Sequence, residues 1–505
     1  MSIVRVFPSV IRLLIPALAG ALIAASARAA PDGSMEKSVV KITTYIHLPD
    51  FDSPWKKDKV QTRHHLGTVV DGGRILVSAG AVGYATLLEM TRFGRSEKVP
   101  LRISFVDYAV NLAVLVPENP GVLKGMQPLR PGNDLRIGDQ AVLLMGHRAR
   151  RTVQMPVRLR EVGIRQTSTS YYSYTHYFFE SRQKSGLGWS EPVIKNGRLV
   201  AMVSGLGGDL VFAIPARVIR HFLEDLGQPP YRGFARLGLG FRRLASPWVR
   251  RWLKAEDATD GIMVTRVGES SPFLGKVQKN DILLSVDGKT ISDSGSYRHP
   301  VWGDISFVDL ISAYHGGDTV KIVVLRQGQK LTLESTLRRY HPGDDLVPAM
   351  RFSPEPHLIF GGLVLQELNM GYLASWGKNW KYNAPDEMLY LWRFQKFPDK
   401  KPGDRVMILS RVLADAHNKG YEGNGNLIVE KVNNHPVHSI QDLRAALAAG
   451  VPDRPGLARF TFAYGGGDII LAYKGMADAH QRISRNYDIP LSGSFYSPDS
   501  GAAGH

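Results

Sequence analysis

The sequence predicts a mainly β protein, and three observations support this prediction. Short runs rich in β-branched residues recur through the N-terminal half and are separated by turn residues, which is typical of a β-barrel or sandwich rather than a parallel α/β sheet. Two later regions, 231–340 and 352–480, combine similar runs with a short helical pattern. The length of 505 residues corresponds to about three domains at roughly 100–200 residues each.

The segment 1–29 has the pattern of a secretory signal peptide. Arg5 and Arg12 supply a basic start, residues 13–25 form an apolar run, and an A-x-A cleavage site ends at Ala29. The apolar run is shorter than the roughly 18 residues that a membrane-spanning helix needs. We therefore expect an exported protein, periplasmic or extracellular after cleavage near Ala29.

Composition excludes several classes of function. The chain contains no cysteine, which excludes disulfides, a thiol nucleophile and thiolate metal sites. Its histidines show no H-x-x-x-H or H-E-x-x-H spacing and no phosphate-binding loop is visible, so we expect neither a metal nor a cofactor. The formal charge of +17 favours weak contact with an anionic envelope surface. No nucleic-acid-binding motif accompanies that charge, so no specific nucleic-acid partner is expected.

The N-terminal region begins with a predicted strand at 39–46 and a hairpin at 66–79. The hairpin has two apolar runs around an Asp-Gly-Gly turn that starts at Asp71. The segment 214–226 has a helical pattern with one apolar face, ended by Gly227. Further short strands are predicted at 101–106, 112–116, 140–145, 193–194 and 199–203.

In chain order, these pieces resemble the protease domain of the Deg/HtrA serine proteases. The matching pieces are the hairpin 67–82, the strand 111–115, a Gly-x-Ser turn at Ser190, and the segment 213–215 before the helix. Downstream, 231–337 and 352–477 resemble the two PDZ domains of the plant-type Deg branch, and 487–490 resembles its C-terminal tail. The resemblance implies the following architecture: a chymotrypsin-like double β-barrel over 30–228, PDZ-like α+β domains over 231–340 and 352–480, and a tail over 481–505.

The first PDZ-like region contains a glycine-rich loop that resembles the carboxylate-binding loop of PDZ domains. Its successive backbone N–H groups would bind a terminal carboxylate while an extended peptide adds to the sheet as a strand. The position of the carboxylate-binding loop is undecided by two residues. Both the Gly-Leu-Gly-Phe stretch and the Leu-Gly-Leu stretch that begins one residue earlier fit the pattern. The candidate peptide-binding residues are Arg236, Leu237, Gly238, Leu239, Gly240 and Phe241.

The second PDZ-like region departs further from the pattern. Its loop would be the Phe-Gly-Gly-Leu stretch that starts at Phe360, and a Trp- and Tyr-rich insertion follows at 372–397. A helix is predicted at 440–449. An aromatic-rich insertion suits an interface, so we expect this region to serve assembly or packing rather than ligand binding.

The resemblance also locates the catalytic positions, and two of the three are altered. Gly80 stands at the histidine position of the family, and no histidine lies between His65 and His147. Asn111 stands at the aspartate position, where a neutral amide would favour the wrong imidazole tautomer. The resemblance therefore implies a degenerate triad.

Ser190 keeps the nucleophile position as a vestige. Its turn runs from Gly188 to Pro192 and is one residue shorter than the family's Gly-Asn-Ser-Gly-Gly-Pro. Gly188 and Ser190 could still offer N–H donors to an oxyanion. Glu191, however, places a carboxylate beside that site and would oppose the developing negative charge.

The leading hypothesis is an exported Deg/HtrA-like pseudoprotease, so the sequence favours a protein without enzymatic activity. Its PDZ domain would bind protein C-termini or unfolded segments in envelope protein quality control, and the resemblance implies a homo-oligomer. A second hypothesis is an active serine endopeptidase in which Lys184 or Lys195 serves Ser190 as a non-standard base. A third is a non-enzymatic assembly or scaffold protein.

Overall fold

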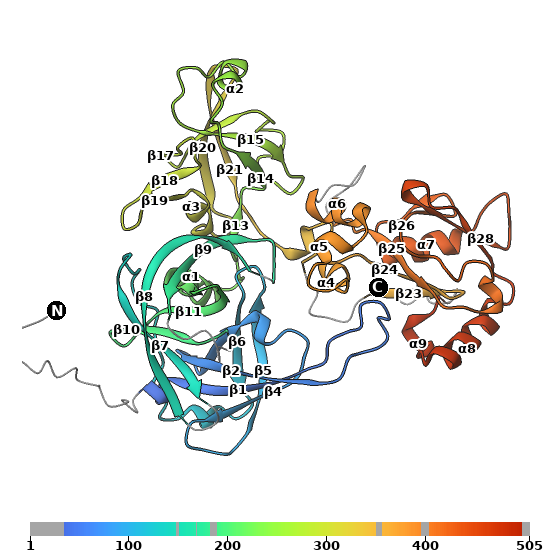
Figure 1. Ribbon diagram of the computed structural model, residues 1–505, viewed down its shortest axis with the longest axis horizontal. Helices are drawn as coiled ribbons and strands as arrows, with labels where there is room; N and C mark the ends of the chain where they lie inside the picture. The colour runs from blue at the N-terminus through green and yellow to red at the C-terminus, as the bar shows by residue number, and fades with distance from the viewer. Residues whose placement is uncertain are drawn as a thin grey trace, which may run out of the picture.

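The computed structural model describes residues 35–147, 151–167, 169–181, 189–349, 356–394 and 403–496. Figure 1 shows a β-barrel region, a domain standing above it and a third domain beside it. The expected signal peptide 1–29, the oxyanion donor Gly188 and the candidate base Lys184 lie outside the described residues. In the part of the chain that is described, no helix is long and apolar enough to cross a membrane.

Two closed six-stranded barrels form the N-terminal half, which confirms the predicted mainly β, double-barrel fold. Alternate residues of the first strand point to opposite sides, as the strand period of two requires. Val40 and Ile42 pack into the core of the first barrel, and Val39 packs against residues of the second. The first barrel consists of β1 (Val39–Ile46), β2 (Gln61–Val70), β3 (Arg74–Ser78), β4 (Ala85–Arg92), β5 (Val99–Asp107) and β6 (Leu112–Pro117).

The second barrel has the strand order β10-β11-β12-β9-β8-β7 and is followed by α1 (Ala216–Leu226). The helix starts two residues later than predicted, because Ile214 and Pro215 pair with β11 and end a strand. Its strands are β7 (Gln140–His147), β8 (Arg151–Gln166), β9 (Ser173–Glu180), β10 (Pro192–Lys195), β11 (Arg198–Gly207) and β12 (Leu210–Pro215).

The next domain contains a sheet in the order β14-β15-β16-β20-β21, with β17 (Lys289–Thr290) attached to β16. Its strands are β14 (Leu239–Arg242), β15 (Ile262–Val267), β16 (Ile282–Val286), β20 (Thr319–Arg326) and β21 (Gln329–Thr336). Two further pairs are β13 (Ala235–Arg236) with β22 (Arg338–Arg339), and β18 (Ser296–His299) with β19 (Gly303–Ser306). The helices are α2 (Pro247–Trp252) and α3 (Val308–Ser312).

The last domain has the sheet order β23-β24-β25-β26-β28-β29, with β27 (His435–Pro436) attached to β26. The predicted helix 440–449 is confirmed as α7 (Ile440–Ala449). The predicted boundary at 480 falls inside α8 (Met476–Tyr487), and both Ile483 and Tyr496 pack into the cores of this domain. The strands are β23 (His357–Phe360), β24 (Leu363–Glu367), β25 (Met407–Val412), β26 (Gly425–Val432), β28 (Leu457–Phe462) and β29 (Ile469–Ala472). The remaining helices are α4 (Met370–Ala374), α5 (Trp380–Asn383), α6 (Asp386–Phe394) and α9 (Leu491–Ser494).

The middle domain is joined to the second barrel through buried polar and aromatic contacts. The Trp302 indole N–H donates to the Leu135 carbonyl at 2.7 Å. Asp309 of α3 is buried and pairs with Arg217 of α1 at 2.9 Å. Because a buried carboxylate is stable only when it is paired, these contacts fix the domain on the barrel.

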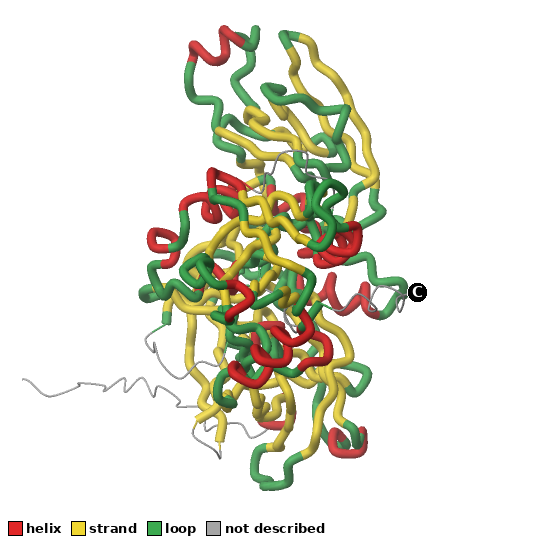
Figure 2. Tube along the Cα trace, turned by 90° about the vertical axis from the view of Figure 1, so that its right-hand side faces the viewer, coloured by secondary structure: helices red, strands yellow, loops and turns green. Residues whose placement is uncertain are grey.

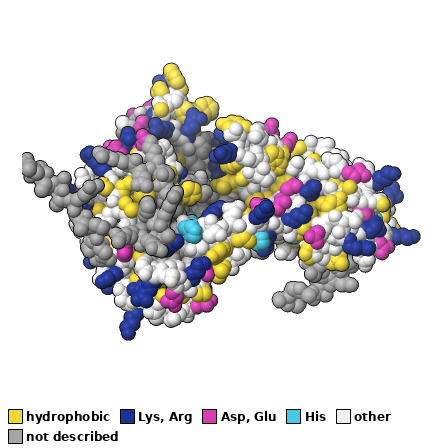
Figure 3. Space-filling model, turned by 60° about the horizontal axis from the view of Figure 1, so that its bottom comes forward, with side chains coloured by type: hydrophobic (Ala, Val, Ile, Leu, Met, Phe, Trp, Pro, Cys, Tyr) yellow, Lys and Arg dark blue, Asp and Glu magenta, His cyan; other side chains and the backbone are white. Residues whose placement is uncertain are grey.

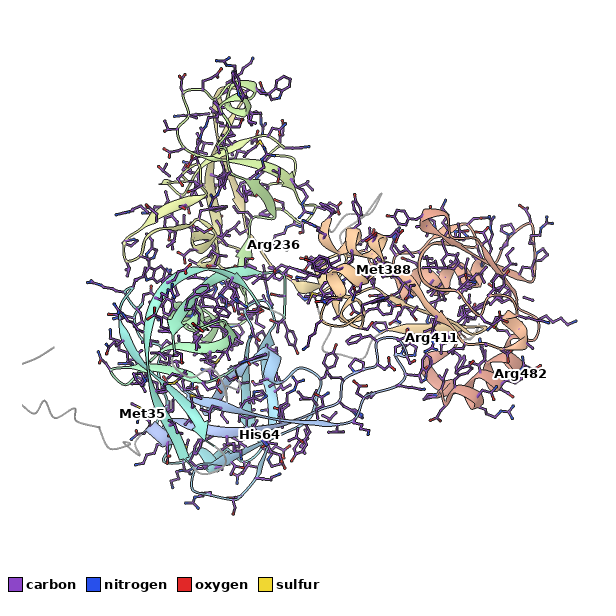
Figure 4. All side chains as sticks on the ribbon, in the orientation of Figure 1. Met35, His64, Arg236, Met388, Arg411 and Arg482 are labelled. Carbon is purple, nitrogen blue, oxygen red and sulfur yellow. The ribbon has the colours of Figure 1, made fainter. Side chains whose placement is uncertain are left out.

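A loop between β1 and β2, residues 47–60, reaches the last domain, and we call it the strap. The Phe51 carbonyl accepts a hydrogen bond from Gln366 Nε2 at 3.0 Å, and Asp52 pairs with Arg411 at 2.9 Å. The Phe51 ring lies so close to Gly371 that a Cβ on that glycine would stand 2.4 Å from it. Figure 4 shows Arg411 where the strap meets the last domain.

Candidate functional site

A groove on the middle domain combines an open sheet edge with an apolar cavity. β14 is the terminal strand of its sheet, and β14 and α3 both line the same cavity. The Phe241 and Phe307 rings meet edge to face with centroids 5.0 Å apart. The cavity has a volume of about 480 Å³, and its apolar walls are formed by Leu237, Leu239, Phe241, Phe307, Val308 and Ile311.

Gly238 shapes the loop that closes one end of the groove. Its φ is +64°, and a Cβ there would lie 2.9 Å from the Ser271 Cα, so only glycine fits. The Gly238 carbonyl accepts from the Gly268 N–H at 2.8 Å, and the Leu237 carbonyl accepts from the Ser271 hydroxyl at 2.6 Å. The N–H groups of Leu237 and Gly238 have no hydrogen-bond partner among the described residues. Such a pair of backbone donors is suited to binding an anion.

The strand register decides between the two readings that the sequence left open. β14 begins at Leu239, and Gly240 pairs with Arg266 of β15 beside a bulge. The loop is therefore the turn of Leu237 and Gly238, with Arg236 at the end of β13 and Leu239 at the start of β14. Gly240 and Phe241 belong to the strand, so the Gly-Leu-Gly-Phe reading is displaced by two residues.

Charged side chains surround the anion-binding end of the groove. Arg236 donates to the Ser270 hydroxyl at 3.0 Å, and its guanidinium lies 4.5 Å from the centre of the Tyr340 ring. The same guanidinium is 3.6 Å from Asp345 Oδ1, and the other Asp345 oxygen accepts from the Tyr340 hydroxyl at 2.6 Å. Burial, the first cause, and Asp345 together raise the pKa of Tyr340. The Asp345 carboxylate thus already lies next to the Arg236 guanidinium, beside the loop that contains Leu237 and Gly238.

Three separate parts of the chain form the cavity. Residues 171–173 of the second barrel line it together with the groove itself and with Asp344 and Asp345 of the segment between the two C-terminal domains. The Tyr172 hydroxyl donates to the Ala235 carbonyl at 2.8 Å, which ties the barrel to the loop. Figure 4 places Arg236 where the middle domain meets the barrel.

Ser190 occupies a closed position in the second barrel. Its side chain is 0% exposed. The hydroxyl donates to Ser78 Oγ at 2.9 Å and accepts from the Ser78 N–H at 3.0 Å. The Ser190 N–H donates to the Glu191 carboxylate at 3.1 Å, so this donor is already engaged. A serine needs a base within hydrogen-bond reach to act as a nucleophile, and here its hydroxyl partner is another serine.

Gly80 and Asn111 lie together beside this position, as the resemblance implies. The Gly80 N–H donates to Asn111 Oδ1 at 2.9 Å, and the Ala79 N–H donates to the Asn111 carbonyl at 3.1 Å. A Cβ at Gly80 would stand 3.5 Å from the same Oδ1, which is an ordinary contact. The site therefore has room for a Cβ at Gly80.

The candidate base Lys195 is engaged elsewhere, and so is His64, a histidine of β2. Lys195 Nζ lies 3.0 Å from Asp139 on the outside of the barrel. His64 is in contact with Thr43 at 3.3 Å, and burial, followed by nearby Lys41, lowers its pKa. Across the described ranges, no group of three or more His, Cys, Asp or Glu side chains could hold a metal ion.

Comparison with known proteins gives the family. The PDZ domain family matches residues 235–337 and again 347–495. The chain is 27% identical over 414 residues to the mitochondrial Do-like 3 protein of Arabidopsis thaliana, covering 80% of this chain and 71% of the relative. It is 25% identical over 430 residues to the chloroplastic protease Do-like 2 of the same plant, covering 82% and 68%.

The two PDZ domains and the Do-like relatives support a Deg/HtrA family protein. A solved structure of the HtrA-type protease AlgW with a decapeptide aligns at a TM-score of 0.46 and 16% identity, covering 61% of this chain and 97% of that one.

The second PDZ domain differs from the first at the ligand edge. β24 corresponds to β14 of the first PDZ domain, because four further strands follow each of them in its sheet and the second of the four carries a short attached strand. Its outer edge is paired with the chain's own β23, from Phe360 opposite Leu363 to His357 opposite Gln366. The Tyr496 N–H then bonds to the Ile359 carbonyl at 2.9 Å. Because the edge is occupied, a peptide cannot add to this sheet as a strand at β24.

Two features of the site were missed by sequence reasoning. Ser78 was seen only as a hairpin residue, although it holds Ser190, and a serine at a strand end gives no local signal of that role. Asp345 lies in a segment without a motif. It reaches the loop because β22 pairs with β13, with Arg338 opposite Arg236.

Proposed function

We propose that this Deg/HtrA family protein is an exported pseudoprotease whose first PDZ domain binds C-termini or extended unfolded segments of other proteins, in envelope protein quality control. The open edge of β14 beside the unpaired N–H groups of Leu237 and Gly238 carries this proposal. A ligand strand would pair with β14, and its terminal carboxylate would accept from the two N–H groups. Its last apolar side chain would enter the cavity between Leu239, Phe307 and Ile311.

The inactivity part of the proposal is supported by the serine turn. The Ser190 hydroxyl is buried and bonded to Ser78, and Glu191 accepts from the N–H that an oxyanion would need. A carboxylate at that place opposes negative charge instead of stabilising it. The basic surface suits an envelope with anionic lipids. Figure 3 shows Lys and Arg side chains spread over the visible face among Asp and Glu.

Two measurements test the parts of the proposal separately. Fluorescence anisotropy with labelled peptides ending in a free apolar residue should show saturable binding, and the same peptides with an amidated C-terminus should bind at least ten-fold more weakly. Gly238→Ala should abolish binding, because its Cβ would collide with the Ser271 backbone. Equal binding of free and amidated peptides would contradict C-terminal recognition.

A fluorophosphonate probe tests catalysis. We expect no covalent labelling of the folded chain, with a conventional serine protease as the positive control. Labelling that disappears in Ser190→Ala would overturn the pseudoprotease assignment and favour the endopeptidase with a non-standard base. Fractionation of the producing cells, with detection of the processed chain outside the cytoplasm, tests the export prediction.

A further inference from the structure

Two tryptophans stand exposed at the free end of the first PDZ domain. Helix α2 carries Trp248 and Trp252, which are 72% and 80% exposed. They are four residues apart, so they lie on the same side of the helix, one turn from each other. Figures 1 and 2 both show α2 at the end of the molecule, away from the barrels and the second PDZ domain.

The helix does not need these two rings for its own packing. Val249 and Leu253 face inward and join a core cluster that includes Met263 and Ile282. The Ser246 hydroxyl accepts from the Val249 N–H and caps the helix, and the Arg250 guanidinium bonds to the carbonyls of residues 258 and 259. The tryptophans are therefore surplus to folding, although exposed indole rings are unfavourable in water.

Exposed cations flank the two tryptophans in the sequence. Arg242, Arg243, Arg251 and Lys254 are exposed, and the segment 242–255 contains no acidic residue. The Arg251 guanidinium lies 5.4 Å from the centre of the Trp248 ring. An acidic partner, Glu256, lies 3.9 Å from Arg251, and both side chains are more than half exposed, so the attraction is weak. The described residues include no ion-pair partner for Arg242, Arg243 or Lys254.

We propose that α2 and its flanking cations form a docking tip for an anionic lipid bilayer surface. Indole rings favour the headgroup level of a bilayer, where the ring is apolar and its N–H remains in a polar layer. Arginine and lysine at the same depth are attracted to anionic headgroups. An aromatic pair alone would also suit a protein partner, but the four exposed cations beside this pair match a surface of repeated negative charge. Docking through this end leaves the strap and the second PDZ domain away from the bilayer (Figure 1).

The experiment is vesicle co-sedimentation with the chain from residue 30 onward, which keeps every described residue and removes the apolar run 13–25. We expect binding to vesicles with one third phosphatidylglycerol, at least ten-fold weaker binding to pure phosphatidylcholine, and a loss as salt rises. Trp248→Ser with Trp252→Ser should reduce binding to the anionic vesicles at least ten-fold. Arg243→Gln with Lys254→Gln should reduce it several-fold and weaken the salt dependence.

Matched variants separate this surface from the rest of the molecule. Tyr382→Ser removes an aromatic ring that is 88% exposed on the second PDZ domain, and Lys289→Gln removes an exposed cation of the first. Both should bind vesicles as the parent does. Lipids brominated near the headgroup should quench the parent's fluorescence and not that of the double Trp variant.

Three results would overturn the proposal: no binding of the parent to anionic vesicles, equal loss in the control variants, or full binding by the double Trp variant. A change of oligomeric state in the double Trp variant without any vesicle binding would assign the tip to a second copy of the chain instead. Peptide binding to the groove is a separate readout and should be the same in all these variants.

Discussion

At the scale of single residues, Asp345 lies where its charge would oppose a ligand carboxylate in the first PDZ groove. Its carboxylate lies 3.6 Å from the Arg236 guanidinium, the charge nearest the loop that would hold a terminal carboxylate. An incoming carboxylate is repelled by Asp345 and must share Arg236 with it. Asp345 would therefore compete with a ligand carboxylate for the Arg236 guanidinium.

Asp345→Asn should strengthen peptide binding. The amide still accepts from the Tyr340 hydroxyl but carries no charge, so the repulsion disappears. We expect about a five-fold lower Kd for peptides with a free C-terminus, roughly 1 kcal/mol. The measurement is fluorescence anisotropy at low and high salt. Asp304→Asn, an exposed carboxylate paired with Arg298, is the control, and a Kd unchanged by Asp345→Asn would contradict the competitor role.

Ser190 gives a second prediction, because its hydroxyl has a structural partner. Ser190→Ala leaves the Ser78 N–H and hydroxyl without a partner in a closed site, which should lower the free energy of unfolding by about 1–3 kcal/mol. Ser78→Ala should cost a similar amount, and the double variant less than the sum of both. Urea unfolding of the three variants measures this. A fully stable Ser190→Ala would mean that the hydroxyl is free for chemistry.

At the scale of elements, the sequence predicts strands well where hydrophobic runs are uninterrupted. β1, the β2–β3 hairpin and α7 match their predicted positions. β8 and β9 were not predicted. The sequence of β8 mixes arginines with apolar residues, and from sequence alone such a stretch looks like a solvated basic loop. Its pairing with β7 and β9 shows that it is a strand.

The candidate site was predictable only where a motif is local. Gly80 and Asn111 lie together because Gly80 follows β3 and Asn111 precedes β6, and these two strands pair with Ser78 opposite Leu112. The loop at Gly238 was found, but its register depended on the pairing of β14 with β15. Asp345 reaches the loop through the pairing of β22 with β13, a long-range contact that no local pattern encodes. The edge-covering β23 instead forms a local hairpin with β24, and the Phe-Gly-Gly-Leu stretch that was expected to be a ligand loop is the turn of that hairpin.

His176 in β9 predicts the acid sensitivity of the second barrel. It is fully buried, and burial lowers its pKa from 6.5 to about 4. As the pH falls below 6.5, the unfolded chain therefore takes up a proton that the folded chain takes up only near pH 4, and stability is lost across that window. His221 and His480, also with a pKa of about 4, act in the same direction.

Unfolding in urea at pH 7.5 and pH 5 tests this prediction. His176 should account for about 2 kcal/mol of the stability lost between the two pH values. His176→Gln should show a loss smaller by that amount, whereas the exposed His435→Gln should show the loss of the parent. An equal loss in the parent and in His176→Gln would contradict the assignment.

At the scale of the whole molecule, the strap fixes the second PDZ domain to the first barrel. Phe51→Ala removes the ring that packs on Gly371 and should weaken this contact by about 1–3 kcal/mol. We expect a larger radius of gyration in X-ray scattering and faster amide exchange in α4. Lys57→Ala, an exposed change in the same loop, should alter neither quantity. An unchanged scattering curve for Phe51→Ala would show that other contacts hold the domain.

The composite cavity has a consequence for any search for ligands. Residues 171–173 and Asp345 are walls of the pocket, yet they lie outside the matched range 235–337. A peptide library screened against that excised range would select for a pocket without these walls and without its internal competitor. A ligand that fills this pocket in the complete chain would contact the barrel, the groove and the linker together. By mass action, its binding would also stabilise the packing of the first PDZ domain on the barrel.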